Sequence, residues 1–183
     1  MPETTELSLI QRRYQDVFGA SVTPAFGSYM SHGAEGRIGA ALGYRRAGEG
    51  TLFLEAYLDR PVEEKVAEAF GRRVARGQIV EIGNFAADCA MTMIELWGAA
   101  ANDLAGGSEI AVATLTAPLR RMFARIGVPV TVLAPARPDR LAGGGAGWGC
   151  YYENDPQVCA GVIVDGQAAI LAFLQRRLRR EAA

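Results

Sequence analysis

The residue best placed for proton chemistry is Glu81, within the apolar segment Ile79-Val-Glu-Ile82. This segment is typical of a buried central strand, where a carboxylate is costly unless it is paired or used in a reaction. Burial raises the pKa of a carboxyl group, so Glu81 could act as a general base. The alternative is a structural ion pair with an arginine such as Arg45 or Arg76.

A second candidate group is Glu55, Tyr57 and Asp59, which alternate along a segment that we expect to be a strand from Thr51. Alternate side chains of a strand share one face. Two carboxylates would then flank a phenol and form a patch that recognises an amine. The alternative for Asp59 is that it caps a helix beginning at Pro61.

A third group follows a glycine-rich loop at 141–147 and contains Trp148, Tyr151 and Tyr152. We expect these residues to start a strand, so Tyr151 and Tyr152 would point to opposite faces. At most one of the two phenols could then protonate a leaving group. The alternative is core packing with a satisfied hydroxyl.

The elements that must position these residues follow from hydrophobic periodicity and from glycine and proline positions. Helices are expected over 4–18, 61–76, 86–104, 118–126 and 168–180. Strands are expected over 26–30, 37–46, 51–58, 78–82, 109–114, 128–134, 148–153 and 158–164, with hairpins at 37–58 and 148–164. This order predicts an α/β (α+β) fold with a mixed central sheet and helices on both faces.

Length and composition limit the possible functions. The 183 residues predict a single domain over 1–183, and 19 basic against 20 acidic residues indicate no nucleic-acid partner. His32 is the only histidine, and the three cysteines form no CxxC pair, so no metal site is expected. The odd cysteine number, the acidic N-terminal segment and the absence of a long apolar run favour a cytoplasmic protein.

Three segments of the chain resemble the thermostable hemolysin family. They are Leu52-Phe-Leu-Glu-Ala-Tyr-Leu-Asp-Arg-Pro-Val-Glu63, Ile79-Val-Glu-Ile-Gly-Asn-Phe-Ala86 and Trp148-Gly-Cys-Tyr-Tyr-Glu-Asn-Asp-Pro-Gln-Val-Cys-Ala-Gly161. The resemblance covers about residues 39–161, in the family's order. It implies a GNAT-like fold, similar to that of acyltransferases and of acyl-homoserine-lactone synthases.

The synthases also carry a glutamate on the strand before the cofactor turn, four residues ahead of a phenylalanine. Glu81 and Phe85 match these two positions, but Asn84 stands where the synthases have an arginine. The resemblance therefore implies acyl transfer without implying a homoserine-lactone product.

The activity that the resemblance implies is transfer of an acyl chain from acyl-CoA or an acyl carrier protein to a small amine, with no tightly bound cofactor. Glu81 would take the amine proton, Glu55, Tyr57 and Asp59 would orient the acceptor, and Tyr151 would protonate the leaving thiolate. Trp148 and Tyr151 would line the acyl tunnel. We expect a turn into a helix to hold the thioester end with free backbone N–H groups, at Asn84, Phe85, Ala86 and Ala87. The alternative is a plain strand-to-helix turn.

A different class of function is suggested by the family's name, which records red-cell lysis, and by the C-terminal arginines. The last helix carries a cluster of four basic residues, Arg176, Arg177, Arg179 and Arg180. A basic amphipathic helix can lie on an anionic membrane or dock an acidic carrier protein. If the helix lies on a membrane, the protein could be membrane-active and non-catalytic. The alternative for the helix is a solvated end whose charges only complement the helix dipole.

Overall fold

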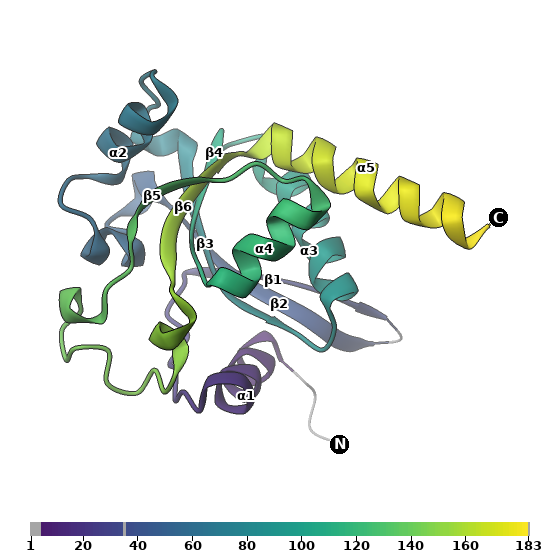
Figure 1. The fold of residues 1–183 in the computed structure, drawn as a ribbon, viewed down its shortest axis with the longest axis horizontal. Helices are drawn as coiled ribbons and strands as arrows, with labels where there is room; N and C mark the ends of the chain where they lie inside the picture. The colour runs from purple at the N-terminus through teal and green to yellow at the C-terminus, as the bar shows by residue number, and fades with distance from the viewer. Residues whose placement is uncertain (1–4, 35, 183) are drawn as a thin grey trace.

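The computed structural model describes residues 5–34 and 36–182 and contains one mixed sheet with the strand order β1-β2-β3-β4-β6-β5 (Figure 1). The strands are β1 (Ser28–Ala34), β2 (Arg37–Arg46), β3 (Ile79–Ala87), β4 (Ile110–Leu115), β5 (Thr131–Pro135) and β6 (Gln157–Val162). The α-helices are α1 (Glu6–Phe18), α2 (Val62–Phe70), α3 (Ala90–Leu104), α4 (Ala117–Ile126) and α5 (Ile163–Glu181). Short 3-10 helices are η1 (Ala47–Glu49), η2 (Phe53–Tyr57), η3 (Arg76–Gln78), η4 (Pro138–Arg140) and η5 (Tyr151–Asn154).

The sheet divides between its two central strands. β3 and β4 pair in parallel only where Ile79–Glu81 faces Ile110–Val112, and every other strand pair is antiparallel. Beyond these residues β3 runs on to Ala87 and β4 to Leu115 without pairing to each other. Glu81 is therefore the last paired residue of β3 on this side, at the point where the strands separate.

A bulge in β3 follows directly after the point of separation. Gly43 pairs with Gly83 and Ala41 with Ala86, so Asn84 and Phe85 lie opposite one residue of β2. Asn84 has a φ of 53°, in the left-handed region that asparagine tolerates better than most residues. Such a bulge re-aims the side chains that follow it.

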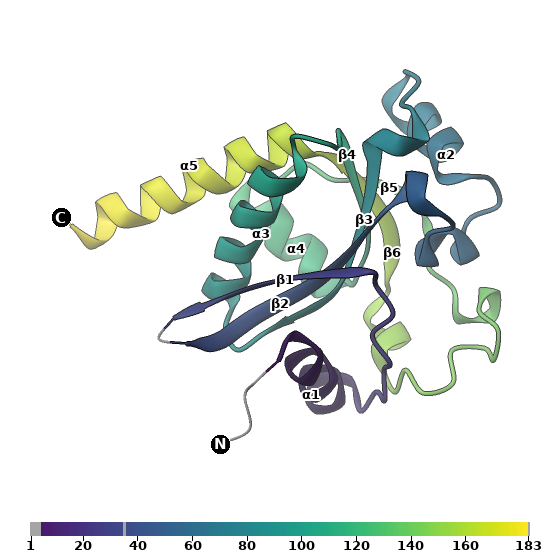
Figure 2. The ribbon, with the colours of Figure 1, turned by 180° about the vertical axis from the view of Figure 1, so that it is seen from behind.

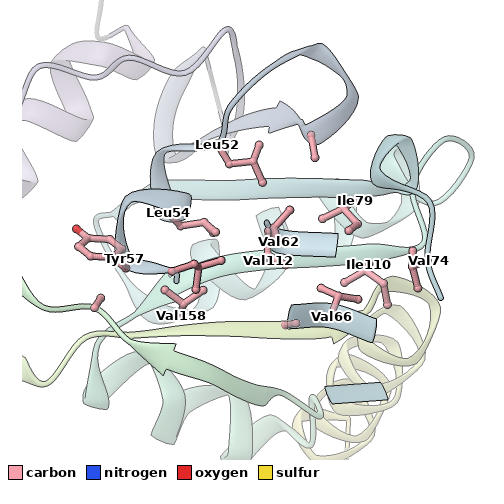
Figure 3. Close-up of a cluster of buried hydrophobic side chains, with 14 residues drawn as sticks. Leu52, Leu54, Tyr57, Val62, Val66, Val74, Ile79, Ile110, Val112 and Val158 are labelled. Atoms are coloured by element: carbon pink, nitrogen blue, oxygen red, sulfur yellow. The ribbon is translucent and has the colours of Figure 1, made fainter. Parts of the chain in front are cut away.

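Helices cover both faces of the sheet, as predicted (Figures 1 and 2). On one face α3, α4 and α5 pack on Val80 and Leu42. On the other face η2 and α2 cover the paired part of β3 and β4, and Figure 3 shows their apolar side chains meeting Ile79 and Val112. α1 covers the far ends of β2 and β3 on the side of Ala41 and Ala86.

The predicted strand over 51–58 is wrong, and so is the hairpin over 37–58. The segment forms η2, and β2 pairs instead with β1 and β3. The carboxylate of Glu55 explains the difference, because it accepts hydrogen bonds from the N–H groups of Leu52 at 2.9 Å and Val62 at 3.0 Å. These bonds fold the chain back on itself and replace the ladder bonds of a strand.

Two expectations about the helix after Pro61 are also wrong. α2 ends at Phe70, because Gly71 adopts a φ of 66° and stops the helix well before Gly77. Asp59 does not cap this helix, since the N-cap residue is Pro61 and no side chain bonds the cap. Asp59 is exposed and pairs with Lys65 at 3.5 Å.

The region around Trp148 differs from the predicted hairpin over 148–164. Tyr151–Asn154 forms η5, and β6 pairs with β4 and β5. Gly149 passes so close to α1 that a Cβ at this position would lie 1.9 Å from the carbonyl oxygen of Phe18, and its φ is 52°. This close approach directs the aromatic residues inward and prevents an extended strand.

Candidate functional site

Glu81 is held by backbone groups from η2. Its two carboxylate oxygens accept hydrogen bonds from the N–H of Phe53 at 2.8 Å and of Leu54 at 3.0 Å. The side chain is buried, with 3% of the residue exposed, and burial raises the pKa of Glu81 to about 7. A carboxyl group with this pKa exchanges a proton at neutral pH, as a general base must.

The alternative of a structural ion pair for Glu81 is wrong within the described residues. Arg76 pairs with Glu55 and Glu63, each at 2.7 Å. Arg45 instead donates to the carbonyl oxygens of Ala25 at 2.6 Å and Thr51 at 3.3 Å. The charge of Arg45 is still near enough to oppose part of the rise in the pKa of Glu81.

Glu81 opens into a cavity that we call the Glu81 pocket. Its polar groups include Glu81, Arg45 and Asn84, and its walls include the aromatic rings of Phe26, Phe53 and Trp148. Phe26 takes its place because Gly83 has no side chain, since a Cβ there would lie 2.7 Å from the Phe26 ring. The pocket thus combines two opposite charges with aromatic walls.

A second space, which we call the junction, adjoins the Glu81 pocket and shares Glu81 with it. Among its lining residues are five that the sequence singled out as site residues. These are Tyr57, Glu81, Asn84, Trp148 and Tyr151. The structure therefore brings together residues that are up to 94 positions apart, since Tyr57 and Tyr151 line the same space.

The tyrosines of the junction are buried and protonated at neutral pH. Burial raises the pKa of Tyr151 well above its usual value. Burial also raises the pKa of Tyr57, whose hydroxyl lies 2.7 Å from that of Tyr152. The expectation that Tyr151 and Tyr152 alternate along a strand is wrong, because both belong to η5. Of these two residues, Tyr151 lines the junction.

A cleft on the other side of the junction, which we call the helical cleft, lies between α1, the end of β3, the start of α3 and α4. Tyr14, Thr114 and Tyr151 line both the cleft and the junction, so the two spaces adjoin at these residues. The Thr114 hydroxyl is buried and has no hydrogen-bond partner among the described residues. Thr114 therefore offers an unpaired polar group where the two spaces meet.

The predicted turn into a helix at residues 84–87 is wrong, because these residues belong to β3 and α3 begins at Ala90. Three of the four still line the helical cleft: Phe85, Ala86 and Ala87. Asn84 lies instead in the Glu81 pocket and the junction. The first turn of α3 reaches the cleft at Cys89 and Ala90, and no side chain bonds the N-cap of this helix.

Positive charges lie beside the helical cleft. A groove between α3, α4 and α5, which we call the arginine groove, is lined by Arg121, Arg125 and Arg177. It shares Ala90, Pro118 and Met122 with the cleft. An anionic group bound near the start of α3 would therefore meet both the positive end of this helix and guanidinium charges.

An apolar cavity lies under the separated strands, among α3, α4, α5 and β6. Its walls include Trp97 and Phe123, whose rings stack at a centroid distance of 4.2 Å. Phe85 lines both this cavity and the helical cleft, and Ile82 lines both this cavity and the junction. Hydrocarbon surface that enters the cavity would be removed from water.

Two predicted acceptor residues do not belong to these spaces. Glu55 makes a two-oxygen ion pair with Arg76, which holds the pKa of its carboxyl group at about 2. Asp59 is exposed beside Lys65. The shared strand face on which the amine-recognition patch was predicted is absent, because Glu55 and Tyr57 lie in a 3-10 helix.

Sequence reasoning missed the part played by Arg45, Phe26 and Thr114. Arg45 faces Glu81 directly across the β2–β3 pair, a relation that depends on register. Phe26 precedes β1 and reaches the pocket through the loop after α1. One local signal was available for Phe26, because the glycines at 43 and 83 on adjacent strands leave space for a ring.

The C-terminal half of α5 projects away from the body of the molecule (Figures 1 and 2). Its arginines are exposed, and so are Leu171 (55%) and Leu178 (66%). None of the helices in the described ranges is long and apolar enough to cross a bilayer.

Several solved structures share this fold. The AHL synthase LasI has a TM-score of 0.58 and 15% identity, over 90% of this chain and 87% of that one. FeeM, an N-acyl amino acid synthase from uncultured soil microbes, has a TM-score of 0.58 and 11% identity, over 90% and 92%. BjaI, a CoA-dependent acyl-homoserine lactone synthase solved with SAM and isopentyl-CoA, has a TM-score of 0.51 and 15% identity, over 84% and 67%. These likenesses confirm the predicted fold.

Two comparisons of sequence give different results. No curated protein matches the chain. The family model described as thermostable hemolysin matches residues 3–167, which is most of the sequence. The resemblance carried by the segments around Glu55, Glu81 and Trp148 is therefore confirmed, and the chain belongs to the thermostable hemolysin family.

Proposed function

We propose that the protein transfers an acyl group from a thioester, carried by coenzyme A or by an acyl carrier protein, to the nitrogen of a small amine. The observation that carries this proposal is the position of Glu81, a buried carboxylate with a near-neutral pKa where β3 and β4 separate. Glu81 lines the polar pocket and the junction, and the apolar cavity and the helical cleft, which lies beside positive charge, each share lining residues with that junction. Acyl transfer needs these three environments for the amine, the acyl chain and the anionic donor.

In the proposed reaction the amine nitrogen attacks the thioester carbonyl carbon and the C–S bond breaks. Glu81 accepts the proton that the nitrogen loses, using the lone pairs that its two backbone hydrogen bonds leave free. Tyr151 is the proposed proton donor to the leaving thiolate, because its phenol is protonated and lines both the junction and the helical cleft. The proton that Glu81 took from the nitrogen then replaces the one that Tyr151 gave, so that the amide and the free thiol leave and both residues regain their starting protonation states. Thr114 is available to hydrogen-bond the donor at the same place.

The donor is assigned to the helical cleft and the arginine groove. The phosphate of a pantetheine arm would lie near the free N–H groups of α3, with Arg121, Arg125 and Arg177 beside it. Both coenzyme A and a carrier protein present such a phosphate. The acyl chain would enter the apolar cavity beyond Phe85.

The test is an assay of thiol release from acyl-CoA and from an acyl carrier protein, each with a mixture of amines. We expect release that depends on the amine, and a loss of at least about 100-fold in kcat for Glu81→Gln, because general base catalysis contributes this much or more. The exposed residue Glu64 provides a matched control, and Glu64→Gln should leave the rate unchanged.

Glutamine can replace only one of the two hydrogen bonds that Glu81 accepts, so the variant could fail through misfolding. Thermal unfolding of both variants separates the two causes. A folded Glu81→Gln protein that releases thiol at the wild-type rate would refute the assignment of the base. No amine-dependent release from either donor would refute the proposed function.

A second candidate function, membrane activity, is favoured by the projecting end of α5, where exposed leucines lie among arginines. A protein with this function alone would release dye from anionic vesicles and would release no thiol. Removing the positive charges of Arg176, Arg179 and Arg180, which do not line the arginine groove, would then abolish leakage. The same substitutions should leave the chemical step at Glu81 intact if the protein is an acyltransferase.

A further inference from the structure

We infer that the amine acceptor is a free α-amino acid with an apolar side chain, and that Arg45 binds its carboxylate. The inference rests on the proposed function, because it assigns the acceptor of that reaction. It names a specificity residue that faces the proposed base across the β2–β3 pair. The chemistry is unchanged: nitrogen attacks the thioester carbon, Glu81 takes the proton and the thiol leaves.

The first observation is the pairing of Arg45 with Glu81. Residues directly opposite in an antiparallel pair project to the same face, with their Cβ atoms about 4.5–5.5 Å apart. Both residues line the Glu81 pocket, yet they form no ion pair with each other. A cation and an anion are thus held side by side, each fixed by the backbone.

The second observation is the set of groups that hold Arg45. Its guanidinium donates to the carbonyl oxygens of Ala25 and Thr51, which carry no net charge. The ion pairs among the described residues involve other arginines, including Arg12, Arg76 and Arg120. A guanidinium has five N–H donors, so donors remain for a ligand. A carboxylate is the group that these donors bind best in a bidentate manner.

The third observation is that the placement of Arg45 beside Glu81 matches the two polar groups of an α-amino acid. In an α-amino acid the amine and the carboxylate are attached to one carbon atom. A molecule with both groups can therefore place its nitrogen at Glu81 and its carboxylate at Arg45, because the two residues are neighbours on adjacent strands. A simple amine would leave the Arg45 charge unmatched within the pocket, at a cost in binding.

The fourth observation concerns the side chain of the acceptor. The aromatic rings of Phe26, Phe53 and Trp148 form walls of the same pocket. Phe53 and Trp148 lie with their ring centroids 6.0 Å apart. Burial of an apolar side chain against these rings stabilises the complex, because apolar surface is removed from water. The pocket therefore favours an apolar or aromatic amino acid over a polar one.

The experiment compares three acceptors that share a benzyl group: L-phenylalanine, L-phenylalaninamide and 2-phenylethylamine. Thiol release from a fixed acyl donor is measured over a range of acceptor concentrations. For the wild type we expect a KM for L-phenylalanine at least about tenfold below that for the other two, because a charged hydrogen-bonded pair is lost with them. Equal KM values for the three acceptors would overturn the inference.

Variants at Arg45 test the residue itself. Arg45→Gln should raise the KM for L-phenylalanine to that of the amide. The readout is the ratio of these two KM values, because any change in the pKa of Glu81 on losing the Arg45 charge acts on both acceptors alike. Arg45→Lys should keep part of the preference, since it keeps the charge but loses the bidentate geometry. Arg73→Gln is the matched control, because Arg73 is exposed and lies outside the pocket. A full preference for L-phenylalanine in folded Arg45→Gln would overturn the role of Arg45.

Binding measured without a donor separates this inference from the proposed function. Calorimetry should detect L-phenylalanine and find 2-phenylethylamine at least about tenfold weaker. Amine-dependent thiol release without a carboxylate preference would overturn the inference alone. Carboxylate-dependent binding without any thiol release would overturn the proposed function and keep the amino-acid site.

Discussion

At the scale of single residues, Glu81 is distinguished by the kind of partners it has. Many buried carboxylates are neutralised by an arginine, as Glu55 is by Arg76, and the pKa of Glu55 falls to about 2 as a result. Glu81 receives only two neutral N–H groups, so burial dominates and its pKa rises. Two glutamates of the same region thus differ in ionisation because Glu55 has a guanidinium partner and Glu81 is more deeply buried.

The pH dependence of the reaction follows from this difference. The base must be deprotonated, so the pH profile of kcat/KM for the wild type should contain a break near pH 7, with the rate rising through it. Folded Glu81→Gln should lack this break. The measurement is a pH–rate profile with one acceptor, which keeps the ionisation of the amine the same for both proteins. A break near pH 7 that persists in the variant would assign it to another group.

At the scale of elements, η2 is the segment whose structure differs most from the structure that its sequence predicts. The largely apolar segment 51–58 predicted a strand. Glu55 instead accepts hydrogen bonds from the N–H groups of Leu52, just before η2, and of Val62, at the start of α2. Its carboxylate is itself fixed by Arg76. Arg76 lies 21 positions away and also donates to the carbonyl oxygens of Ala47 and Gly50. Contacts of this range outweigh local preference, and no local pattern reveals them.

The network around Arg76 makes a prediction about stability. Arg76→Gln should lower the free energy of unfolding by about 2 kcal/mol, because Glu55 loses its charged partner while staying mostly buried. Arg60→Gln, which breaks an exposed pair with Glu68, should lower it far less, because water and salt screen such a pair. Urea titrations of the two variants make the comparison. If both variants lower the free energy of unfolding by the same amount, the contacts of Arg76 stabilise the protein no more than an exposed ion pair does.

The same network sets the direction of a pH effect. The pKa of Glu55 is lower in the folded protein than its ordinary value of 4.5. Its contribution to stability is therefore present above about pH 4.5 and is lost as the pH falls toward 2. Glu81 acts in the opposite sense, because its pKa is raised, and its contribution is lost as the pH rises through about 7.

At the scale of the whole molecule, the order of helices and strands was largely predictable from the sequence. The way in which they bring the site residues together was not. Strong periodicity and glycine stops located β2, β4 and α4 within a residue or two. The glycine and asparagine at 83 and 84 predict a turn, but the structure has a bulge there, because these residue types favour both structures. Arg45 was considered only as an ion-pair partner, since its position opposite Glu81 depends on a register that a single sequence does not reveal.

The arrangement of thiols offers a test of where the donor binds. Cys89 is exposed at the helical cleft, and a hydrogen bond with Thr92 lowers the pKa of its thiol. Cys159 is buried, which raises the pKa of its thiol to about 11. We expect maleimide to modify Cys89 much faster than Cys159, and acyl-CoA or acyl carrier protein to slow this modification in proportion to occupancy. Peptide mass spectrometry locates the label.

The control for this experiment is Cys89→Ser, which should lose the fast phase of labelling. An amine acceptor without donor should leave the labelling rate unchanged, because the Glu81 pocket and the helical cleft share no lining residue. Donor binding that leaves Cys89 fully reactive would show that the thioester lies elsewhere.

The separation of these two spaces has a consequence for the order of events. Each one joins the junction through different residues, so one reactant does not have to leave before the other arrives. For the proposed reaction, both substrates can occupy the protein together in a ternary complex. The acyl group then passes directly from sulfur to nitrogen through the gap between β3 and β4, and the protein never has to carry it on a side chain of its own.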